Sequence, residues 1–275
     1  MCLISQLLYR PLKTRQVITK ITHQRPLYEL RPGRNKKLVL GSVGFGLLIL
    51  AVLPMVNLFV SGVVGFKSLD WGDFLSASVR SVSLSLQVGF ISVILCFSGS
   101  YLVRHSKNNF LKNLIYLTST LPVAISSMVL GLAITLGFSG SDWIKDKMLG
   151  VIIIQSISVL PLGFRILDES FSKIDTKIYQ VAESLGASKI AQLMMLEFPL
   201  IKKAIVLVFA SGIGISLGET ASLLLFESQG RLTLPLWLFR LMGTYQFEQA
   251  QAVGLILMVL TILVFGVREK WHSSR

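Results

Sequence analysis

Residues 178–199 read Ile-Tyr-Gln-Val-Ala-Glu-Ser-Leu-Gly-Ala-Ser-Lys-Ile-Ala-Gln-Leu-Met-Met-Leu-Glu-Phe-Pro and lie between two strongly apolar segments. In and just before this stretch, apolar residues recur at helical spacing and are expected to form one face: Ile174, Ile178, Val181, Ala182 and Leu185. Gly186 is placed to end this helix, because glycine adopts positive φ without a steric cost. The sequence therefore predicts an amphipathic helix that turns at Gly186.

A second, shorter helix is expected directly after this turn. Ser188 is a favourable N-cap residue, and apolar residues follow it at Ile190, Leu193 and Met194. Pro199 is expected to end the second helix. Two short helices joined by a tight turn form an elbow, a shape that suits docking into a groove on a soluble partner.

The spacing of this elbow resembles the signature cytoplasmic loop of bacterial ABC-importer permeases. The family pattern is Glu-Ala-Ala, three residues, Gly, nine residues and Ile-x-Leu-Pro. Its positions are filled here by Gln180-Val181-Ala182, by Gly186 and by Leu196-Glu197-Phe198-Pro199. The leading Glu of the family is Gln180 in this chain, and Val181 replaces an alanine.

This resemblance implies that the elbow is a coupling helix, which sits in a cleft on a separate cytoplasmic ATPase subunit that uses the ATP. The implied ATPase-coupling residues are Gln180, Val181, Ala182, Glu183, Ser184, Leu185, Gly186, Ala187, Ser188, Lys189 and Pro199. The implied fold is an all-α integral membrane protein, a type I (MetI-like) permease core with six transmembrane helices. The implied partners are a second permease subunit, identical or homologous, and a periplasmic or extracytoplasmic substrate-binding protein.

The composition is that of a membrane protein. Hydrophobic residues make up 52% of the 275 residues, and charged residues only 15%, against about a quarter in soluble domains. Apolar runs predict six spans, at about 38–65, 84–103, 114–138, 149–164, 204–226 and 251–267. We expect a basic tail at 1–37 and a permease domain at 38–270, with the coupling loop at 165–203.

The net charge of +13 is explained by topology rather than by a nucleic-acid partner. Of the 27 Lys and Arg residues, 21 fall in residues 1–37, 104–113, 165–203 and 268–275. Positive charge marks the cytoplasmic side of a membrane protein. Both termini and the elbow are therefore expected in the cytoplasm, with the spans in the bacterial inner membrane.

The fifth predicted span carries two further features. Small residues repeat every four positions at Ala210, Gly214, Gly218 and Ser222, a pattern that predicts a closely packed helix interface. Glu219 is the one acid within the six predicted spans, with Thr220 beside it. Two interpretations stay open: these residues line the pathway or its gate, or Glu219 braces a broken helix.

The sequence shows no P-loop pattern and no recognisable catalytic triad, and its three histidines lack metal-ligand spacing. We therefore expect a transport subunit rather than an enzyme, with no cofactor or metal of its own. An ion-coupled transporter is disfavoured by the near isolation of Glu219. A membrane enzyme would have to use four acids that we interpret as solvated, namely Asp168, Glu169, Asp175 and Glu183.

The C-terminal part resembles the second half of thiamine permeases. The residues that carry this likeness are Ser216-Leu217-Gly218-Glu219, Thr233-Leu234-Pro235 and Met242-Gly243-Thr244-Tyr245. Ferric-iron permeases share much of this pattern, and Gly-Glu-Thr-Ala at 218–221 is also similar to phosphate permeases. The resemblance implies thiamine or a similar small hydrophilic solute as substrate, with ferric iron or an oxyanion as the alternative. Such families commonly fuse two halves, and this chain has the length of one half plus a basic tail.

Overall fold

The computed structural model describes residues 34–137, 147–225 and 232–273, with side chains for 41–137, 148–225 and 232–266. It divides the chain into two units, Met1–Leu53 and Pro54–Arg275, and the second unit contains every element considered below except the first part of α2. Residues 1–33 of the predicted basic tail lie outside the described residues, and residues 34–37 begin a helix.

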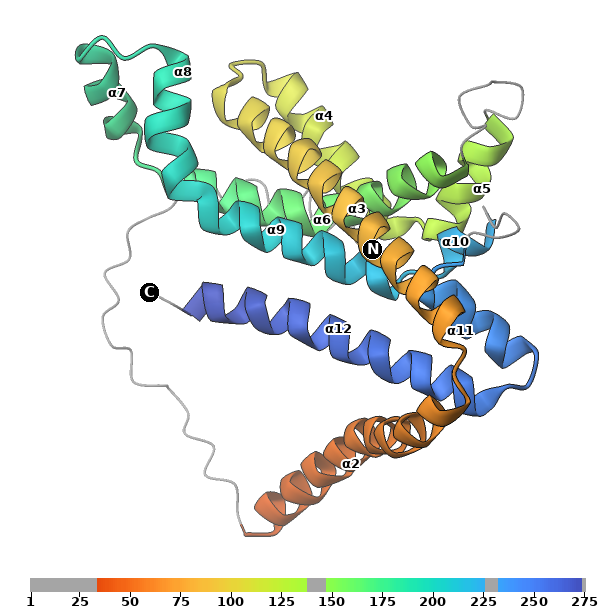
Figure 1. Cartoon of the computed structure of the whole chain (residues 1–275). Helices are drawn as coiled ribbons and strands as arrows, with labels where there is room; N and C mark the ends of the chain where they lie inside the picture. Colours follow the sequence, from red (N-terminus) through yellow and green to blue (C-terminus); the bar gives the residue numbers. More distant parts are fainter. Residues whose placement is uncertain (1–33, 138–146, 226–231, 274–275) are drawn as a thin grey trace. The chain divides into compact units, whose positions relative to one another are not determined.

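Every regular element in the described part of the chain is helical (Figure 1). The long helices are α2 (Arg34–Gly65), α3 (Trp71–His105), α6 (Lys147–Ser172), α9 (Phe198–Gly218) and α12 (Phe247–Ser273). The shorter ones are α4 (Asn109–Thr120), α5 (Ser127–Gly137), α7 (Thr176–Ser184), α8 (Lys189–Gln192), α10 (Ala221–Leu225) and α11 (Leu234–Gly243). Three single turns join them: the 3₁₀ turns η1 (Phe66–Ser68) and η2 (Leu121–Ala124), and the π-helical turn η4 (Leu193–Glu197).

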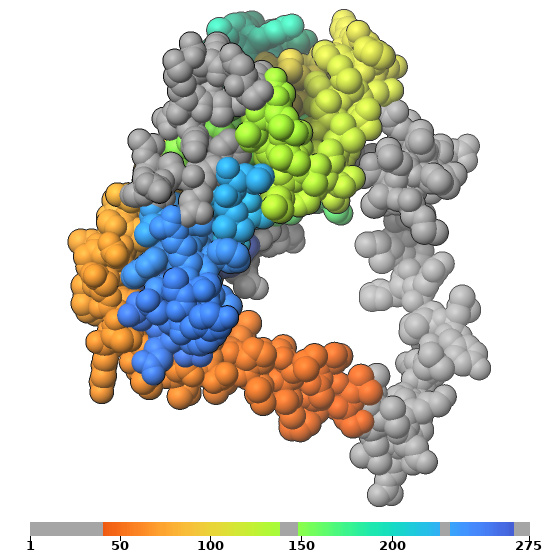
Figure 2. Space-filling view, turned by 90° about the vertical axis from the view of Figure 1, so that its right-hand side faces the viewer, coloured from red at the N-terminus to blue at the C-terminus, as the bar shows by residue number. Residues whose placement is uncertain are grey.

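Among the described residues, five helices are long and apolar enough to cross a membrane, and the bent pair α4–α5 makes a sixth span if it is counted as one. The third predicted span, 114–138, is therefore not one straight helix. Its two parts meet at 110°, because Pro122 in η2 has no N–H to donate and Ile125 is extended. Figure 2 shows α4 and α5 on one face of the molecule, with α10 beside α5.

Helices α3, α6 and α9 pack against one another and form the centre of the second unit. Where α3 meets α9, a Cβ built on Gly212 would lie 2.8 Å from the Cα of Gly89, so the two backbones touch. Where α6 packs against α3, a Cβ built on Gly163 would lie 2.7 Å from the Sγ of Cys96. The buried face of α3 is correspondingly rich in small residues, namely Ser81, Ser85, Gly89, Ser92, Cys96 and Ser100. Small side chains let helices approach closely inside a membrane.

The fifth predicted span, 204–226, is broken, and its stripe of small residues does not stay on one helix. Gly214 packs on α12, where an added Cβ would lie 2.8 Å from a ring carbon of Phe265. Gly218 ends α9 and has nothing within 4 Å of its Cβ position, and Ser222 lies in α10. The break occurs because Glu219 is extended and its carboxylate accepts hydrogen bonds from the first backbone N–H groups of α10.

A buried polar group spans this break. The Gln155 side chain, on α6, accepts a hydrogen bond from the Ser216 hydroxyl at 2.7 Å and donates one to Ser222 Oγ at 3.2 Å. Because Ser216 precedes the break and Ser222 follows it, Gln155 holds the two segments in a fixed relation.

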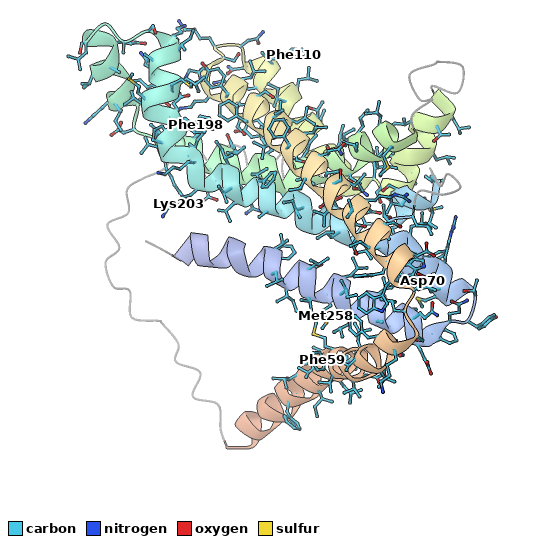
Figure 3. The ribbon with its side chains drawn as sticks, viewed as in Figure 1. Phe59, Asp70, Phe110, Phe198, Lys203 and Met258 are labelled. Atoms are coloured by element: carbon cyan, nitrogen blue, oxygen red, sulfur yellow. The ribbon has the colours of Figure 1, made fainter. Side chains whose placement is uncertain are left out.

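The two ends of α3 carry different structures. Figure 3 shows Asp70 at one end of α3, while Phe110 of α4 and Phe198 of α9 lie toward the other. The Asp70 carboxylate caps α3 by accepting from the backbone N–H of Gly72 at 2.9 Å. The opposite end of α3 is the one that meets the elbow.

The contact between α3 and α9 predicts a specific sensitivity to added volume. Gly212→Ala is expected to lower the stability of the purified chain by about 1–3 kcal/mol, because the new methyl group meets backbone rather than a flexible side chain. Thermal unfolding in detergent measures this loss. The matched control is Gly266→Ala in α12, whose Cβ position has nothing within 4 Å and which should be neutral or slightly stabilising. Equal unfolding temperatures for the two variants would contradict the proposed crossing.

Candidate functional site

The elbow predicted from residues 178–199 is present, and its first arm is α7. The Asp175 carboxylate caps α7 by accepting from the backbone N–H of Lys177 at 3.0 Å. Figure 1 shows α7 leading through a short connection into α8, at the end of the molecule where α3 stops.

The turn between the two arms depends on Gly186. Its φ is +77°, in the left-handed region that residues other than glycine and asparagine rarely adopt. The Gly186 N–H donates to the Glu183 carbonyl at 3.0 Å, and the Ala187 N–H donates to the Ala182 carbonyl at 3.0 Å. These two bonds make a complete Schellman motif, so the turn is a defined structure.

The second arm starts at Ser188, as the sequence predicts. The Ser188 hydroxyl oxygen accepts from the backbone N–H of Ala191 at 3.2 Å, and the Gln192 side chain donates to the Ala187 carbonyl at 3.2 Å. Lys189 opens α8 and is exposed. Both ends of the turn are therefore fixed by local hydrogen bonds.

The expectation that Pro199 ends the second helix is wrong. The chain stays helical from α8 through η4 into α9, and Lys189–Gly218 is one apolar segment of 30 residues. In η4 the Phe198 N–H reaches back to the Leu193 carbonyl, a π-helical bond, and Pro199 then occupies the first turn of α9. Proline is tolerated there because its missing N–H falls where the hydrogen-bond register already changes.

The apolar face predicted for the first arm divides into two. Ile174 and Ala182 are buried, and Ile174 packs with Phe171 and Ile201. Ile178, Val181 and Leu185 are instead exposed, by 40%, 58% and 81%. Their spacing of three and four residues places them along one side of α7 and its C-cap residue, Leu185.

The second arm adds more exposed apolar side chains. Ile190, Met194 and Met195 are exposed by 75%, 65% and 77%. Gln180, Glu183, Ser184 and Lys189 are exposed among them, and Ala187 is half-buried. We call Ile178, Val181, Leu185, Ile190, Met194 and Met195 the apolar elbow surface. Exposed apolar side chains on both arms of a short segment between long helices favour an interaction site.

The base of the elbow contains an acid that sequence reasoning missed. Glu197 is 1% exposed, and its Oε1 accepts the Tyr179 hydroxyl at 2.8 Å and lies 3.0 Å from Nε2 of His105. Burial and the neighbouring Glu197 carboxylate raise the pKa of Tyr179 to about 12, so its hydroxyl stays protonated and donates. An acid isolated between Leu196 and Phe198 was the available signal. Its partners come from distant segments and left no local pattern.

Glu219 and Thr220 lie at the α9–α10 break. The Ser127 hydroxyl of α5 donates to the Glu219 carboxylate at 3.0 Å, and the Ala221 N–H donates to it at 2.9 Å. The geometry is that of a brace between two short helices. A role in the pathway or its gate stays a prediction for both residues.

The four acids considered for a lipid enzyme do not form one cluster. Asp168 accepts the Tyr116 hydroxyl at 3.0 Å, Glu169 pairs with Lys173 at 3.0 Å, and Asp175 caps α7. Glu183 is exposed on the elbow. Each of the first three has a separate structural role, which removes the basis for a joint catalytic site.

Residues 99–269 match the family of binding-protein-dependent transport system inner membrane components. The chain belongs to this family. The matched region includes the elbow, the α9–α10 break and all of α6 and α9, but only the last turns of α3. The expectations of a multi-pass inner-membrane transport component and of a transport subunit rather than an enzyme are confirmed at this level.

Relatives within the family include thiamine permeases. The thiamine transport system permease protein ThiP of Brucella abortus (strain 2308) is 24% identical over 241 residues, which cover 85% of this chain and 43% of ThiP. The probable transport system permease protein NifC of Clostridium pasteurianum is 25% identical over 250 residues, covering 82% of this chain and 84% of NifC. The chain thus spans less than half the length of ThiP and most of the length of NifC.

Solved structures support the predicted fold. A chain of a bacterial alginate ABC transporter, in complex with an alginate pentasaccharide-bound periplasmic protein, aligns with a TM-score of 0.64 at 14% identity. The alignment covers 88% of this chain and 95% of that one. A chain of an amino acid ABC transporter aligns with a TM-score of 0.55 at 16% identity, covering 81% and 96%. The all-α, MetI-like permease fold is therefore confirmed.

The Schellman turn predicts a graded response at Gly186. Gly186→Val is expected to destabilise the turn by about 1–2 kcal/mol, because a branched side chain is strained at positive φ. Gly186→Asn should cost less, because asparagine tolerates this conformation. Hydrogen exchange at the Gly186-position and Ala187 amides measures the effect, with the α3 and α9 amides as internal controls. Equal protection in the Val and Asn variants would contradict a left-handed residue at this position.

Proposed function

We propose that this chain is the permease subunit of an ATP-driven importer. In this proposal the elbow is the coupling helix that docks into a separate cytoplasmic ATPase, and two permease subunits form the translocation pathway. The single observation that carries the proposal is the apolar elbow surface, held outward by a fixed turn in a chain of this family.

The spacing on α7 supports a groove-shaped partner. Ile178, Val181 and Leu185 stand three and then four residues apart, which is the pattern of anchors that a helix presents to a groove. Leaving such side chains in water is unfavourable by about 25 cal/mol for each Å² of apolar surface, and a partner would remove that surface from water. A rigid elbow also loses little conformational entropy on docking.

Charge supports the side on which this partner lies. The elbow lies within 165–203, one of the four segments that together hold 21 of the 27 Lys and Arg residues. The proposal therefore places the elbow and both termini in the cytoplasm and the Asp70 end of α3 outside. A substrate-binding protein would deliver its cargo at that outer end.

For the substrate we propose thiamine or a similar small hydrophilic solute. The support is the similarity to ThiP over 85% of this chain and the C-terminal motifs that resemble thiamine permeases. Ferric iron and oxyanions are the alternatives.

Charge placed on the apolar elbow surface tests the proposal. In Leu185→Glu/Ile190→Glu, the P-loop ATPase that co-purifies with the tagged chain from its own membranes should fall about tenfold or more, because two anchors become charged. Uptake of labelled thiamine by intact cells should fall in parallel. The matched control is Phe247→Glu, which places a charge on an exposed apolar residue at the start of α12, and it should retain the ATPase.

Two outcomes would change the proposal in different ways. An ATPase that never co-purifies with the wild-type chain would contradict the importer assignment. Retained ATPase with uptake of ferric iron or phosphate in place of thiamine would replace the substrate and leave the permease role intact.

A further inference from the structure

We propose that Tyr179, Glu197 and His105 form a polar latch that transmits movement of the elbow to α3 and α9. This inference rests on the proposed function, because it assigns to these side chains the task of keeping ATP hydrolysis and transport coupled. They act as positioning residues, since none belongs to the apolar elbow surface.

The latch is centred on one carboxylate oxygen. Oε1 of Glu197 receives the Tyr179 hydroxyl at 2.8 Å and faces Nε2 of His105 at 3.0 Å, while Oε2 has no hydrogen-bond partner among the described residues. Burying a carboxyl group is unfavourable unless its oxygens have partners, and removing one partner lowers the stability of the buried state. Loss of either contact on Oε1 would therefore destabilise this part of the fold.

Three separate elements meet at this oxygen. Tyr179 lies in α7, Glu197 ends η4 immediately before α9, and His105 is the last residue of α3. The latch thus links the first arm of the elbow to the cytoplasmic ends of two central helices.

His105 is itself held in place. Its Nδ1 lies 3.1 Å from the Tyr101 carbonyl oxygen, and its ring packs on the Tyr101 ring, tilted by 30°, with 4.3 Å between centroids. One ring nitrogen faces a carbonyl oxygen and the other a carboxylate oxygen, and these two contacts fix the orientation of the His105 ring.

A second tether from α3 reaches the same arm. The Arg104 guanidinium donates to the Ile174 carbonyl at 2.8 Å and lies 5.6 Å from the centre of the Tyr179 ring. Arg104 therefore contacts the chain just before α7 and again at Tyr179 within it, while the adjacent His105 reaches Tyr179 through Glu197. The side of α7 that carries Ile178, Val181 and Leu185 is left for a partner.

The consequence is directional. A partner that moves the apolar elbow surface pulls on Tyr179, and the pull passes through Glu197 to α9 and through His105 to α3. Because α3 and α9 touch at Gly89 and Gly212, the two central helices respond together. Without the latch the elbow still docks, but its movement bends the elbow locally and does not reach α3 and α9.

Tyr179→Phe tests this mechanism with a single atom. It removes the hydroxyl and keeps the ring on which Arg104 packs. In the complete importer, reconstituted in proteoliposomes with its binding protein, the ATPase should remain bound and hydrolyse ATP at a rate within about twofold of wild type. Labelled thiamine taken up per ATP should fall about tenfold, the size expected when a buried acceptor loses one hydrogen bond.

The matched control is Tyr116→Phe. The Tyr116 hydroxyl also donates to a carboxylate, that of Asp168, in the same part of the molecule, but it joins α4 to α6 and not to the elbow. Uptake per ATP should be unchanged in this variant. An equal loss in both variants would mean that any hydroxyl–carboxylate bond at this end matters and would overturn the latch.

A double variant separates a latch from local stabilisation. Tyr179→Phe and His105→Gln should not add in their effect on uptake per ATP, because both act through Oε1 of Glu197. Additive losses, or unchanged uptake per ATP in Tyr179→Phe with the ATPase still bound, would overturn the proposal. An ATPase that fails to bind the wild-type chain would instead contradict the proposed function, so the two failures are distinguishable.

Discussion

Close backbone contact between α3 and α9 is the constraint on which the other elements depend. Inside a bilayer, helices gain little from the hydrophobic effect, and packing of small residues has to hold them together. Gly89 and Gly212 allow that approach, and Gly163 lets α6 enter beside Cys96. This crossing sets the positions of the C-terminal end of α3 and the N-terminal end of α9 relative to each other. His105 is the last residue of α3, and Glu197 directly precedes α9. The base of the elbow is therefore set by a contact in the middle of the membrane helices.

Breaks in the helices occur where side chains replace the lost backbone hydrogen bonds. The Glu219 carboxylate accepts hydrogen bonds from the first N–H groups of α10. The Gln155 side chain makes hydrogen bonds to the segments before and after the break. At the elbow, Asp175 and Ser188 cap the two arms, and Gly186 provides the turn. Since an unpaired backbone group in lipid is costly, such breaks persist only with substitutes of this kind. They are also the places where a helical membrane protein can change direction.

The features that the sequence predicted correctly are local ones. Gly186 and Ser188 act within five residues along the chain, so their types and spacing were enough to predict the turn and the cap. The long apolar runs likewise predicted most of the membrane helices, because length and composition decide them.

Features that depend on distant residues were missed or misread. Pro199 was expected to end a helix. The sequence does not show that a π-helical turn precedes it, so that the helix continues although Pro199 has no N–H to donate. The α4–α5 bend at Pro122 and the break at Glu219 depend on packing with α6, α10 and α5. Glu197 could be noticed as an isolated acid, but its partners Tyr179 and His105 are 18 and 92 residues away. The recurring small residues of α3, from Ser81 to Ser100, were a usable signal for the central contact.

Photo-crosslinking reports directly whether a cytoplasmic ATPase holds this chain at the elbow. A photoreactive phenylalanine analogue would replace Ile190, which is 75% exposed, in the full chain in its own membranes. We expect one dominant crosslink from this position to a protein with a P-loop, and none to that protein from the same analogue at Phe247. Crosslinks from position 190 only to lipid, or equal ATPase crosslinks from both positions, would mean that the elbow is not the docking site.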